Sequence, residues 1–274
     1  MIYCIIKMEG QGGCFMVSVI IPAAGKGTRM KAGINKAFLE LAGKPMLFRT
    51  VMRFAGIEGV GEIVVAVGAD EVAFIRWSLS KIPGLPAVKV VAGGSERQMS
   101  VANALKAVSE DADTILVHDA ARPLVTKSVI ESVIAEAQKS GAAIAAVKAK
   151  NTIKRVSADG VVEDTPDRST LWEVQTPQGF SRGVIMEAYL RAMQDGFVGT
   201  DDASLVERMG HPVRVVEGTY RNIKVTSPED ILMAEAMLRD EAIGKAKDGI
   251  ETLMVKLAEK AITLRQKVEK EMRK

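Results

Sequence analysis

Short runs of β-branched residues alternate with amphipathic stretches along most of the chain. The runs have the length and composition of buried strands, and the stretches have the apolar period of helices. The strands are expected at about Val17–Ile21, Glu62–Val67, Val88–Val91, Thr114–Val117 and Ala143–Val147, and the helices at about Met46–Ala55, Glu71–Leu79, Gln98–Val108 and Lys127–Ser140. This alternation predicts an α/β fold with a mostly parallel sheet covered on both faces.

The alternation stops after Lys148. The segment at about 150–165 predicts a polar β-hairpin with strands at Thr152–Val156 and Gly160–Glu163, joined by a turn that contains Asp-Gly. Because such a hairpin has little core of its own, we expect it to protrude as an arm and to pack against something else, such as a second subunit.

Strand patterns return at Val213–Val216 and Asn222–Val225, and a helix follows them. Ser227 is a suitable N-cap for this helix, Pro228 suits its first position, and Asp230 completes a start that resembles a capping box.

The two ends differ from the body of the chain. Residues 1–15 precede the first strand, residues 16–240 are expected to form one domain, and residues 241–274 are expected to form a charged helical tail. The tail fits a helix packed on its own domain or on a partner chain, and both Met1 and Met16 fit a start codon. Its apolar residues recur in steps of three and four, as in a coiled-coil seam, at Ile250, Leu253, Leu257, Ala261, Leu264 and Val268.

Composition excludes several classes of protein. Hydrophobic residues make up 47% of the 274-residue chain and charged residues 26%, which is ordinary for a soluble globular protein. The net charge of +3 is too small to predict nucleic-acid binding. No apolar run reaches the length of a membrane span, and the start lacks a secretory signal, so a cytoplasmic location is expected. The two cysteines, Cys4 and Cys14, exclude a disulfide framework and a cysteine-based site in the body of the chain.

The first strand runs into a loop rich in small residues, Pro22-Ala-Ala-Gly-Lys-Gly-Thr-Arg-Met30. Such a loop lets backbone N–H groups approach a phosphate. It is not a Walker A loop, because Lys26 is followed by Gly27, and Met30 stands where a dinucleotide fingerprint needs a small residue. The nearby cations Arg29 and Lys36 suit a triphosphate whose pyrophosphate leaves. A purely structural turn remains an alternative.

A second motif, Val117-His-Asp-Ala-Ala-Arg-Pro123, follows a predicted buried strand directly. Ligands of open α/β sheets bind at the carboxyl ends of strands, so Asp119 is expected to share a cleft with the first loop. A single carboxylate facing triphosphate oxygens is a usual way to hold Mg²⁺, although Asp119 also suits a turn cap. We interpret His118 as structural rather than as a catalytic base.

Further polar motifs lie downstream, at Asp167-Arg168, Thr176-Pro-Gln178, Thr200-Asp-Asp-Ala203 and Asn222-Ile-Lys-Val-Thr226. Taken singly, Arg168 and Lys224 fit solvated surface charges as well as site residues.

Together these motifs closely resemble the 2-C-methyl-D-erythritol 4-phosphate cytidylyltransferase family of the non-mevalonate isoprenoid pathway, from about Val17 to Leu238. The resemblance implies a single Rossmann-like nucleotidyltransferase domain that joins CTP to a polyol phosphate, releases pyrophosphate, uses Mg²⁺ and forms a homodimer through its β-arm. It leaves the tail without a counterpart.

The resemblance also implies roles for individual residues. Arg29 and Lys36 would stabilise the transition state, Arg168 and Lys224 would orient the substrate phosphate, and Asp119 would position Mg²⁺. The implied nucleotide contacts are Ala23, Ala24, Gly25, Gly27, Gly94, Ser100, Asp119 and Ala120. The implied polyol contacts are Arg122, Thr152, Arg168, Thr176, Thr200 and Lys224.

The chain departs from the family pattern at a few positions. Asn35 stands where the family usually has proline, which is expected to loosen the loop carrying Lys36, and Ser95 and Asn151 replace aspartates. None of these changes removes a charge assigned to catalysis. A ribitol 5-phosphate cytidylyltransferase is the nearest alternative, followed by a nicotinamide-dependent dehydrogenase and a catalytically silent nucleotide-binding regulator.

Overall fold

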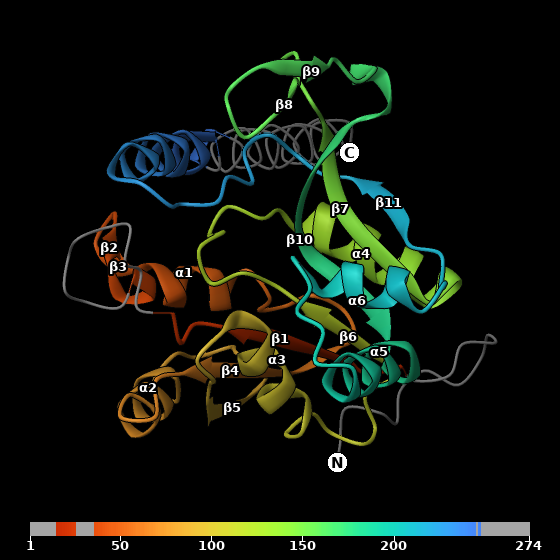
Figure 1. The fold of residues 1–274 in the computed structure, drawn as a ribbon. Coiled ribbons are helices and arrows are strands. Elements are labelled where there is room, and N and C mark those ends of the chain that lie inside the picture. The colour runs from red at the N-terminus through yellow and green to blue at the C-terminus, as the bar shows by residue number, and fades with distance from the viewer. Residues whose placement is uncertain (1–14, 26–35, 245, 248–274) are drawn as a thin grey trace, which may run out of the picture.

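A seven-stranded sheet organises the protein, which we describe from a computed structural model (Figure 1). The model describes residues 15–25, 36–244, 246 and 247. The strands lie in the order β11-β7-β10-β6-β1-β4-β5, and every neighbouring pair is parallel except the two pairs made by β10. Their bounds are β1 (Val17–Pro22), β4 (Val60–Val67), β5 (Ala87–Ala92), β6 (Thr114–Val117), β7 (Ala142–Lys148), β10 (Trp172–Ser181) and β11 (Arg214–Glu217).

Helices cover both faces of this sheet, because successive strand residues point to opposite sides. On β1, Val19 and Ile21 belong to one core cluster and Ile20 to the other. The first cluster packs against α1 (Met46–Met52), α2 (Val72–Leu79) and α4 (Lys127–Ser140). The second packs against α3 (Arg97–Leu105), α5 (Arg182–Gln194) and α6 (Asp202–Arg208).

Helix α4 illustrates how local sequence sets these elements. Its buried side chains, which include Val129, Val133 and Ala137, recur at helical spacing along one face. Thr126 caps its first turn by accepting a hydrogen bond from the backbone N–H of Val129 at 3.4 Å. The helix ends at Gly141, whose φ of 86° is the left-handed conformation that glycine adopts without steric cost.

The predicted arm projects from the sheet between β7 and β10 (Figure 1). It contains a short antiparallel pair, β8 (Arg155–Val156) and β9 (Val162–Asp164), and the 3-10 helix η3 (Arg168–Thr170). Val156 and Val161 are 50% and 60% exposed in the single chain. The arm therefore carries apolar surface that the described part of the chain does not cover. A second small hairpin, β2 (Glu40–Leu41) with β3 (Lys44–Pro45), follows the 3-10 helix η2 (Lys36–Phe38).

The predicted parallel strands and the helices between them are confirmed, with ends shifted by at most three residues. The prediction of a strand at Asn222–Val225 is wrong. This segment is irregular because its hydrogen-bonding groups serve β10 and the loop of Asp119: Asn222 Nδ2 donates to the Thr176 carbonyl at 2.8 Å, and Val225 N–H donates to the Ala121 carbonyl at 2.8 Å.

The chain ends are described only in part. Residues 228–244 are helical, and Asp230 accepts from the backbone N–H groups of Thr226 and Ser227 at 2.6 and 2.8 Å, so the predicted cap is confirmed. Residues 1–14 and most of the predicted tail, 248–274, lie outside the described residues. Among the described residues, none of the helices combines the length and apolarity needed to cross a membrane.

Candidate active site

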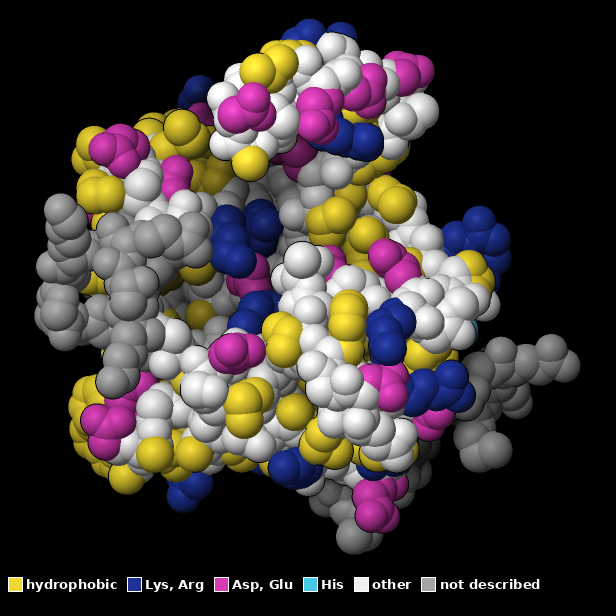
Figure 2. Space-filling view, in the orientation of Figure 1, with side chains coloured by type: hydrophobic (Ala, Val, Ile, Leu, Met, Phe, Trp, Pro, Cys, Tyr) yellow, Lys and Arg dark blue, Asp and Glu magenta, His cyan; other side chains and the backbone are white. Residues whose placement is uncertain are grey.

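The loops that follow β1, β4, β5 and β6 meet at one edge of the sheet, because parallel strands end on the same side. Backbone hydrogen bonds continue past the strand ends and tie these loops together. The N–H of His118 donates to Ile20 at 2.9 Å, and the N–H of Gly93 donates to Val67 at 2.7 Å. Figure 2 shows Lys and Arg side chains gathered in a hollow below the arm.

Small residues let the loops after β1 and β5 touch. A Cβ added to Gly93 would lie 2.5 Å from the Cβ of Ala24 and 2.8 Å from the Ser100 hydroxyl, and one added to Gly94 would lie 2.4 Å from Met99. Ser100 is 2% exposed, and its hydroxyl accepts from the Gly94 N–H at 3.0 Å. Ser100 thus shapes the Gly93–Gly94 loop, whose close approach to Ala24 leaves a surface without projecting side chains.

The carboxylate of Asp119 is held by cations from three segments of the chain. Lys224 Nζ lies 2.7 Å from Oδ2, Arg97 Nε donates to Oδ1 at 3.0 Å, and Arg122 Nε lies 3.8 Å from Oδ2. Arg97 also reaches Asp202, with Nη2 at 2.7 Å from Oδ2. Three cations therefore face two carboxylates, which leaves the described part of the site with a net positive charge suited to a polyanion.

Burial and charge act in opposite directions on the pKa of Asp119. Burial would raise the pKa of Asp119, but Arg97, Lys224 and Arg122 outweigh it and hold that pKa well below its ordinary value. Asp202 is fully buried, and its other oxygen accepts from the Tyr189 hydroxyl at 2.5 Å. Burial and the neighbouring Asp202 carboxylate raise the pKa of Tyr189 well above its usual range. Asp119 is therefore ionised at neutral pH.

His118 is enclosed and fully hydrogen bonded. The Arg122 carbonyl, 3.0 Å from Nε2, can only accept, so Nε2 carries the proton and Nδ1 accepts from the Thr176 hydroxyl at 3.1 Å. The Thr176 hydroxyl in turn accepts from the Asp119 N–H at 3.0 Å. This chain fixes the Asp119 loop on β10. It also occupies the hydroxyl of Thr176, which was expected to contact the polyol.

The segment around Asn222 orients two of the cations. Asn222 is fully buried, and its carbonyl accepts from Arg122 Nη1 at 2.7 Å. Its side chain is anchored to the Thr176 carbonyl, and Lys224 follows two residues later. Lys224 and Arg122 thus reach Asp119 because a buried asparagine fixes the backbone beside them.

Two predicted site residues are not joined to this cluster within one chain. Arg168 is exposed on the arm, where its Nη1 donates to the Lys150 carbonyl at 2.8 Å, and Thr152 is exposed near the base of the arm. Thr200 is exposed but lies beside the cluster, because the next residues, Asp201 and Asp202, begin α6.

Four predicted site residues in and after the phosphate loop are described little or not at all. Gly27 and Arg29 lie outside the described residues, and Gly25 is the last described residue before that gap. Lys36 begins η2, and the buried side chain of Ala37 anchors this turn in the core. The side chain of Lys36 is not among those described.

The family model of 2-C-methyl-D-erythritol 4-phosphate cytidylyltransferase matches residues 17–240. The chain belongs to this family. A relative of that name from Symbiobacterium thermophilum is 50% identical over 226 residues, which are 82% of this chain and 94% of the relative. Another of that name, from Caldanaerobacter subterraneus, is 45% identical over 81% of this chain and 99% of the relative.

Solved structures agree with this family assignment. The crystal structure of 4-diphosphocytidyl-2C-methyl-D-erythritol synthase from Anaerococcus prevotii matches with a TM-score of 0.73 and 32% identity, over 82% of this chain and 99% of that one. A Thermus thermophilus 2-C-methyl-D-erythritol 4-phosphate cytidylyltransferase matches with a TM-score of 0.67 and 34% identity, over 82% and 100%. This member of the family is therefore an α/β nucleotidyltransferase with a Rossmann-like fold, and its tail from Glu241 onward lies beyond the family match.

Several residues of this cytidylyltransferase site were not given roles from the sequence. Asp202 and Asn222 lie inside motifs that the sequence analysis singled out, and Arg97 lies between the implied nucleotide contacts Gly94 and Ser100, so the signal was present. Their pairing was not predictable, because it joins segments that are distant in the sequence: Arg97 and Asp202 are 105 residues apart.

The donor set of this site suits a metal that arrives with phosphate ligands. No group of three or more His, Cys, Asp or Glu side chains able to hold a metal occurs in the described part of the chain. The side chain of Asp202 has no exposed surface, whereas that of Asp119 is 10% exposed and pairs with the partly exposed Lys224, so Asp119 is the carboxylate nearer to solvent. One carboxylate is enough for Mg²⁺, which keeps waters and binds through substrate phosphates.

The environment of His118 predicts a pH dependence of stability. Burial lowers its pKa to about 4, whereas the unfolded chain takes up a proton near pH 6.5. Between these values only the unfolded chain binds the proton, so the free energy of unfolding should fall by about 3 kcal/mol as the pH drops from about 6.5 to about 4. Urea unfolding at pH 7 and pH 4 measures this difference.

The control for this prediction is to make the same substitution at both histidines and to compare the two variants. His118→Gln should lose this part of the pH dependence, and His211→Gln, which changes the other of the two histidines, should keep it. Equal slopes in both variants would show that His118 does not supply the effect.

Proposed function

We propose that the protein transfers the cytidylyl group of CTP to 2-C-methyl-D-erythritol 4-phosphate, giving 4-diphosphocytidyl-2-C-methyl-D-erythritol and pyrophosphate. The carrying observation is the Asp119 carboxylate held by Lys224, Arg97 and Arg122 at the strand ends, beside the Gly93–Ser100 loop. Relatives named for this activity match over most of the chain, and they favour it over ribitol 5-phosphate transfer, a dehydrogenase and a silent regulator.

The reaction needs alignment more than proton transfer. A phosphate monoester has a second pKa near 6 and is mostly a dianion at neutral pH, so it attacks the α-phosphate of CTP without a base. His118, whose two ring nitrogens are both engaged, is not needed for proton abstraction. The attacking oxygen forms a bond to the α-phosphorus as the bond to the pyrophosphate oxygen breaks, with no covalent enzyme intermediate.

The cations of the site act where negative charge must be neutralised. Lys224 and Arg122 pair with Asp119 in the free enzyme, and an incoming phosphate offers them a second anionic partner in the same place. Lys224 is 43% exposed and so can turn toward a ligand. We assign Lys224 and Arg168 to the substrate phosphate, and Arg29 and Lys36 to the charge that grows on the α-phosphate and pyrophosphate.

The nucleotide is assigned to the loops that touch beside Asp119. Backbone groups face this place at Ala23, Ala24, Gly25 and Gly94. A Cβ at Gly93 or Gly94 would clash with neighbouring atoms, so the loop stays free of side chains there, which suits a flat base lying close to the backbone. Ser100 supports that loop from behind. Gly27 and the backbone at Ala120 are assigned to the phosphates.

Mg²⁺ is part of the proposal. Asp119 would hold it together with oxygens of CTP, and the ion would neutralise charge on the triphosphate. In the free enzyme Lys224 and Arg97 compensate the same carboxylate, so Asp119 is kept ionised and ready to bind a cation.

A homodimer explains the residues on the arm. Arg168 and Thr152 are separate from the Asp119 cluster in one chain, and the arm exposes apolar side chains. If the arm packs on a second copy, Arg168 and Thr152 of that copy complete the polyol side of the site with Thr200. We also propose that the enzyme has no nucleic-acid partner, because its net charge of +3 is small. We propose a cytoplasmic location because no apolar run in the sequence reaches the length of a membrane span.

The substrate assignment predicts Mg²⁺-dependent pyrophosphate release with CTP and 2-C-methyl-D-erythritol 4-phosphate. Ribitol 5-phosphate should react more slowly under matched conditions, and ATP, GTP and UTP should be poor donors. Coupled pyrophosphate detection measures all of these rates. Faster turnover of ribitol 5-phosphate would overturn the acceptor while leaving the class of reaction intact.

The charge assignment predicts that Arg29→Ala and Lys36→Ala mainly lower kcat. Each removes a donor that acts where charge accumulates, so a loss of about 10²–10³ in rate is expected. Steady-state kinetics measure it, and Lys127→Ala is the control because Lys127 lies on the surface of α4 with a 65% exposed side chain. A variant that kept half the parental kcat would take its residue out of the mechanism.

The dimer assignment predicts complementation between two inactive chains. If Arg168 acts across the subunit boundary, each mixed dimer of Arg168→Ala and Lys36→Ala contains one intact site. Random exchange should then restore about a quarter of the parental activity. If subunit exchange is demonstrated and no activity returns, each site is built from one chain.

A further inference from the structure

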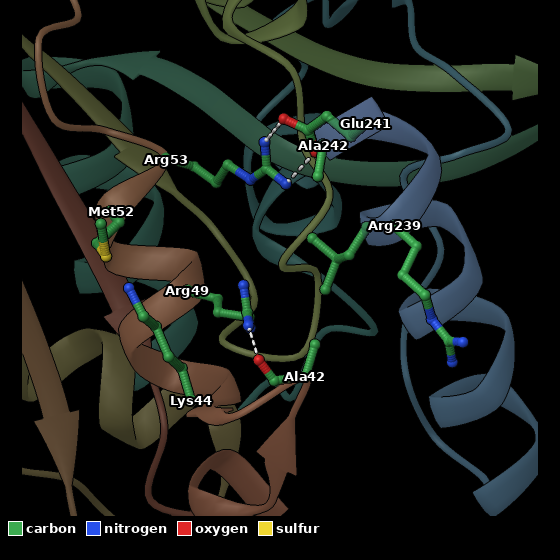
Figure 3. A pocket seen from close by; sticks show the side chains of 9 residues that line it. Ala42, Lys44, Arg49, Met52, Arg53, Arg239, Glu241 and Ala242 are labelled. Carbon is green, nitrogen blue, oxygen red and sulfur yellow. Dashed lines mark hydrogen bonds and ion pairs between the residues drawn. The ribbon is translucent and has the colours of Figure 1, made fainter. Parts of the chain in front are cut away.

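Arg53 joins the active-site loop to the C-terminal helix. It is the residue that follows α1, and its Nε donates to the Pro123 carbonyl at 2.7 Å. Its two terminal nitrogens donate to the two carboxylate oxygens of Glu241, both at 2.8 Å (Figure 3). This paired geometry fixes the plane of the guanidinium as well as its position.

The loop that Arg53 holds carries Asp119 and Arg122. Helix α1 contacts this loop a second time, because Thr50 Oγ1 donates to the Ala120 carbonyl at 2.8 Å in a buried position. Two side chains of one helical face thus hold the backbone on both sides of Arg122. The Thr50 contact is enclosed, whereas the Arg53 contact depends on how an otherwise mobile guanidinium is oriented.

Glu241 supplies that orientation. Arg53 lies at a pocket of about 450 Å³ between α1 and the C-terminal helix, where Lys44 and Arg49 add positive charge (Figure 3). Burial and the neighbouring Arg53 charge lower the pKa of Arg49, while Glu235 and Glu241 raise it. Without the carboxylate of Glu241, repulsion from Lys44 and Arg49 would favour positions of the Arg53 side chain farther from Pro123, and the pocket leaves room for such positions.

Glu241 is also the first residue beyond the family match, which ends at residue 240. We propose that Glu241 is a positioning residue of this enzyme: through Arg53 it fixes the loop that carries Asp119 and Arg122, and so it couples the added C-terminal segment to the active site. The inference rests on the proposed function for its kinetic consequences, but the physical coupling can be measured without turnover.

The test compares Glu241→Gln with Asp240→Asn in the full-length chain. Asp240 is the neighbouring acid on the same helix and pairs with Arg221 at 2.8 Å on the surface, so its variant has the same change of charge without touching Arg53. Hydrogen exchange followed by mass spectrometry should show faster exchange across residues 119–125 in Glu241→Gln only. Glu241→Asp, which keeps the charge, should lie between Glu241→Gln and the parent.

Steady-state kinetics distinguish a positioning role of Glu241 from a loss of folded protein. A smaller folded fraction lowers kcat and leaves KM unchanged, whereas a displaced loop raises the KM for the polyol phosphate and the Mg²⁺ concentration needed for half-maximal rate. We expect the KM for the polyol phosphate and the Mg²⁺ concentration for half-maximal rate each to rise about fivefold in Glu241→Gln. A change of this size is the scale expected for the loss of a partly exposed ion pair. Arg53→Lys, which loses the two-pronged contact, should match it.

Unchanged exchange at residues 119–125 together with a parental KM in Glu241→Gln would overturn the coupling. If the parent itself fails to use CTP and the polyol phosphate, the proposed function fails, and the exchange measurement still decides whether Glu241 holds the loop.

Discussion

The carboxylate of Asp119 at the end of β6 is the constraint around which the site is built. A carboxylate this far from water is costly unless charged partners compensate it. Here the partners come from three segments: Arg97 at the start of α3, Arg122 in the loop of Asp119 itself, and Lys224 after the buried Asn222. Satisfying one charge therefore fixes three loops relative to one another, and these loops form most of the described site.

The same pairing prepares the enzyme for charged ligands. Under the proposed function, Lys224 and Arg122 are already in place before the substrate phosphate arrives, and the phosphate becomes a second anionic partner for them, so cations need not be gathered from solvent. Arg97 differs from them because it also serves the buried Asp202, and it has little freedom to leave. We therefore regard Arg97 as a fixed support and Lys224 as the cation that responds to substrate.

Much of the fold could be predicted because its central strands are buried on both faces and read as continuous apolar runs. The strand β10 was not predicted from the sequence. Its residues Gln175, Thr176 and Gln178 are polar, and the register of its pairing with β7 shifts between Val174 and Gln178, so no simple period marks it. The polar residues are there because they hydrogen bond the loops of the site. Likewise Asn222–Val225 has the composition of a strand, but its groups hydrogen bond to β10 and to the Asp119 loop instead.

For the site, the sequence identified the motifs but not their pairing. Asp119 was expected at the strand ends, and the family resemblance implied Arg122 and Lys224 as substrate contacts; the structure brings the three together. The role of Arg97 depends on a contact with Asp202, which no local pattern encodes. The position of Arg168 could not be predicted either, since its place on the arm separates it from the cluster within one chain.

The antiparallel direction of β10 has a consequence for how this protein can assemble. Strand β7 runs toward the edge that carries Asp119, the arm follows, and β10 returns from that same edge. A parallel β10 would have needed a crossover to the far edge before pairing, and the insertion between the strands would have had no fixed place. One reversed strand thus ties the arm to the catalytic side of the sheet. If a second subunit packs on the arm, as proposed, it contacts the protein on the same side of the sheet as the active site.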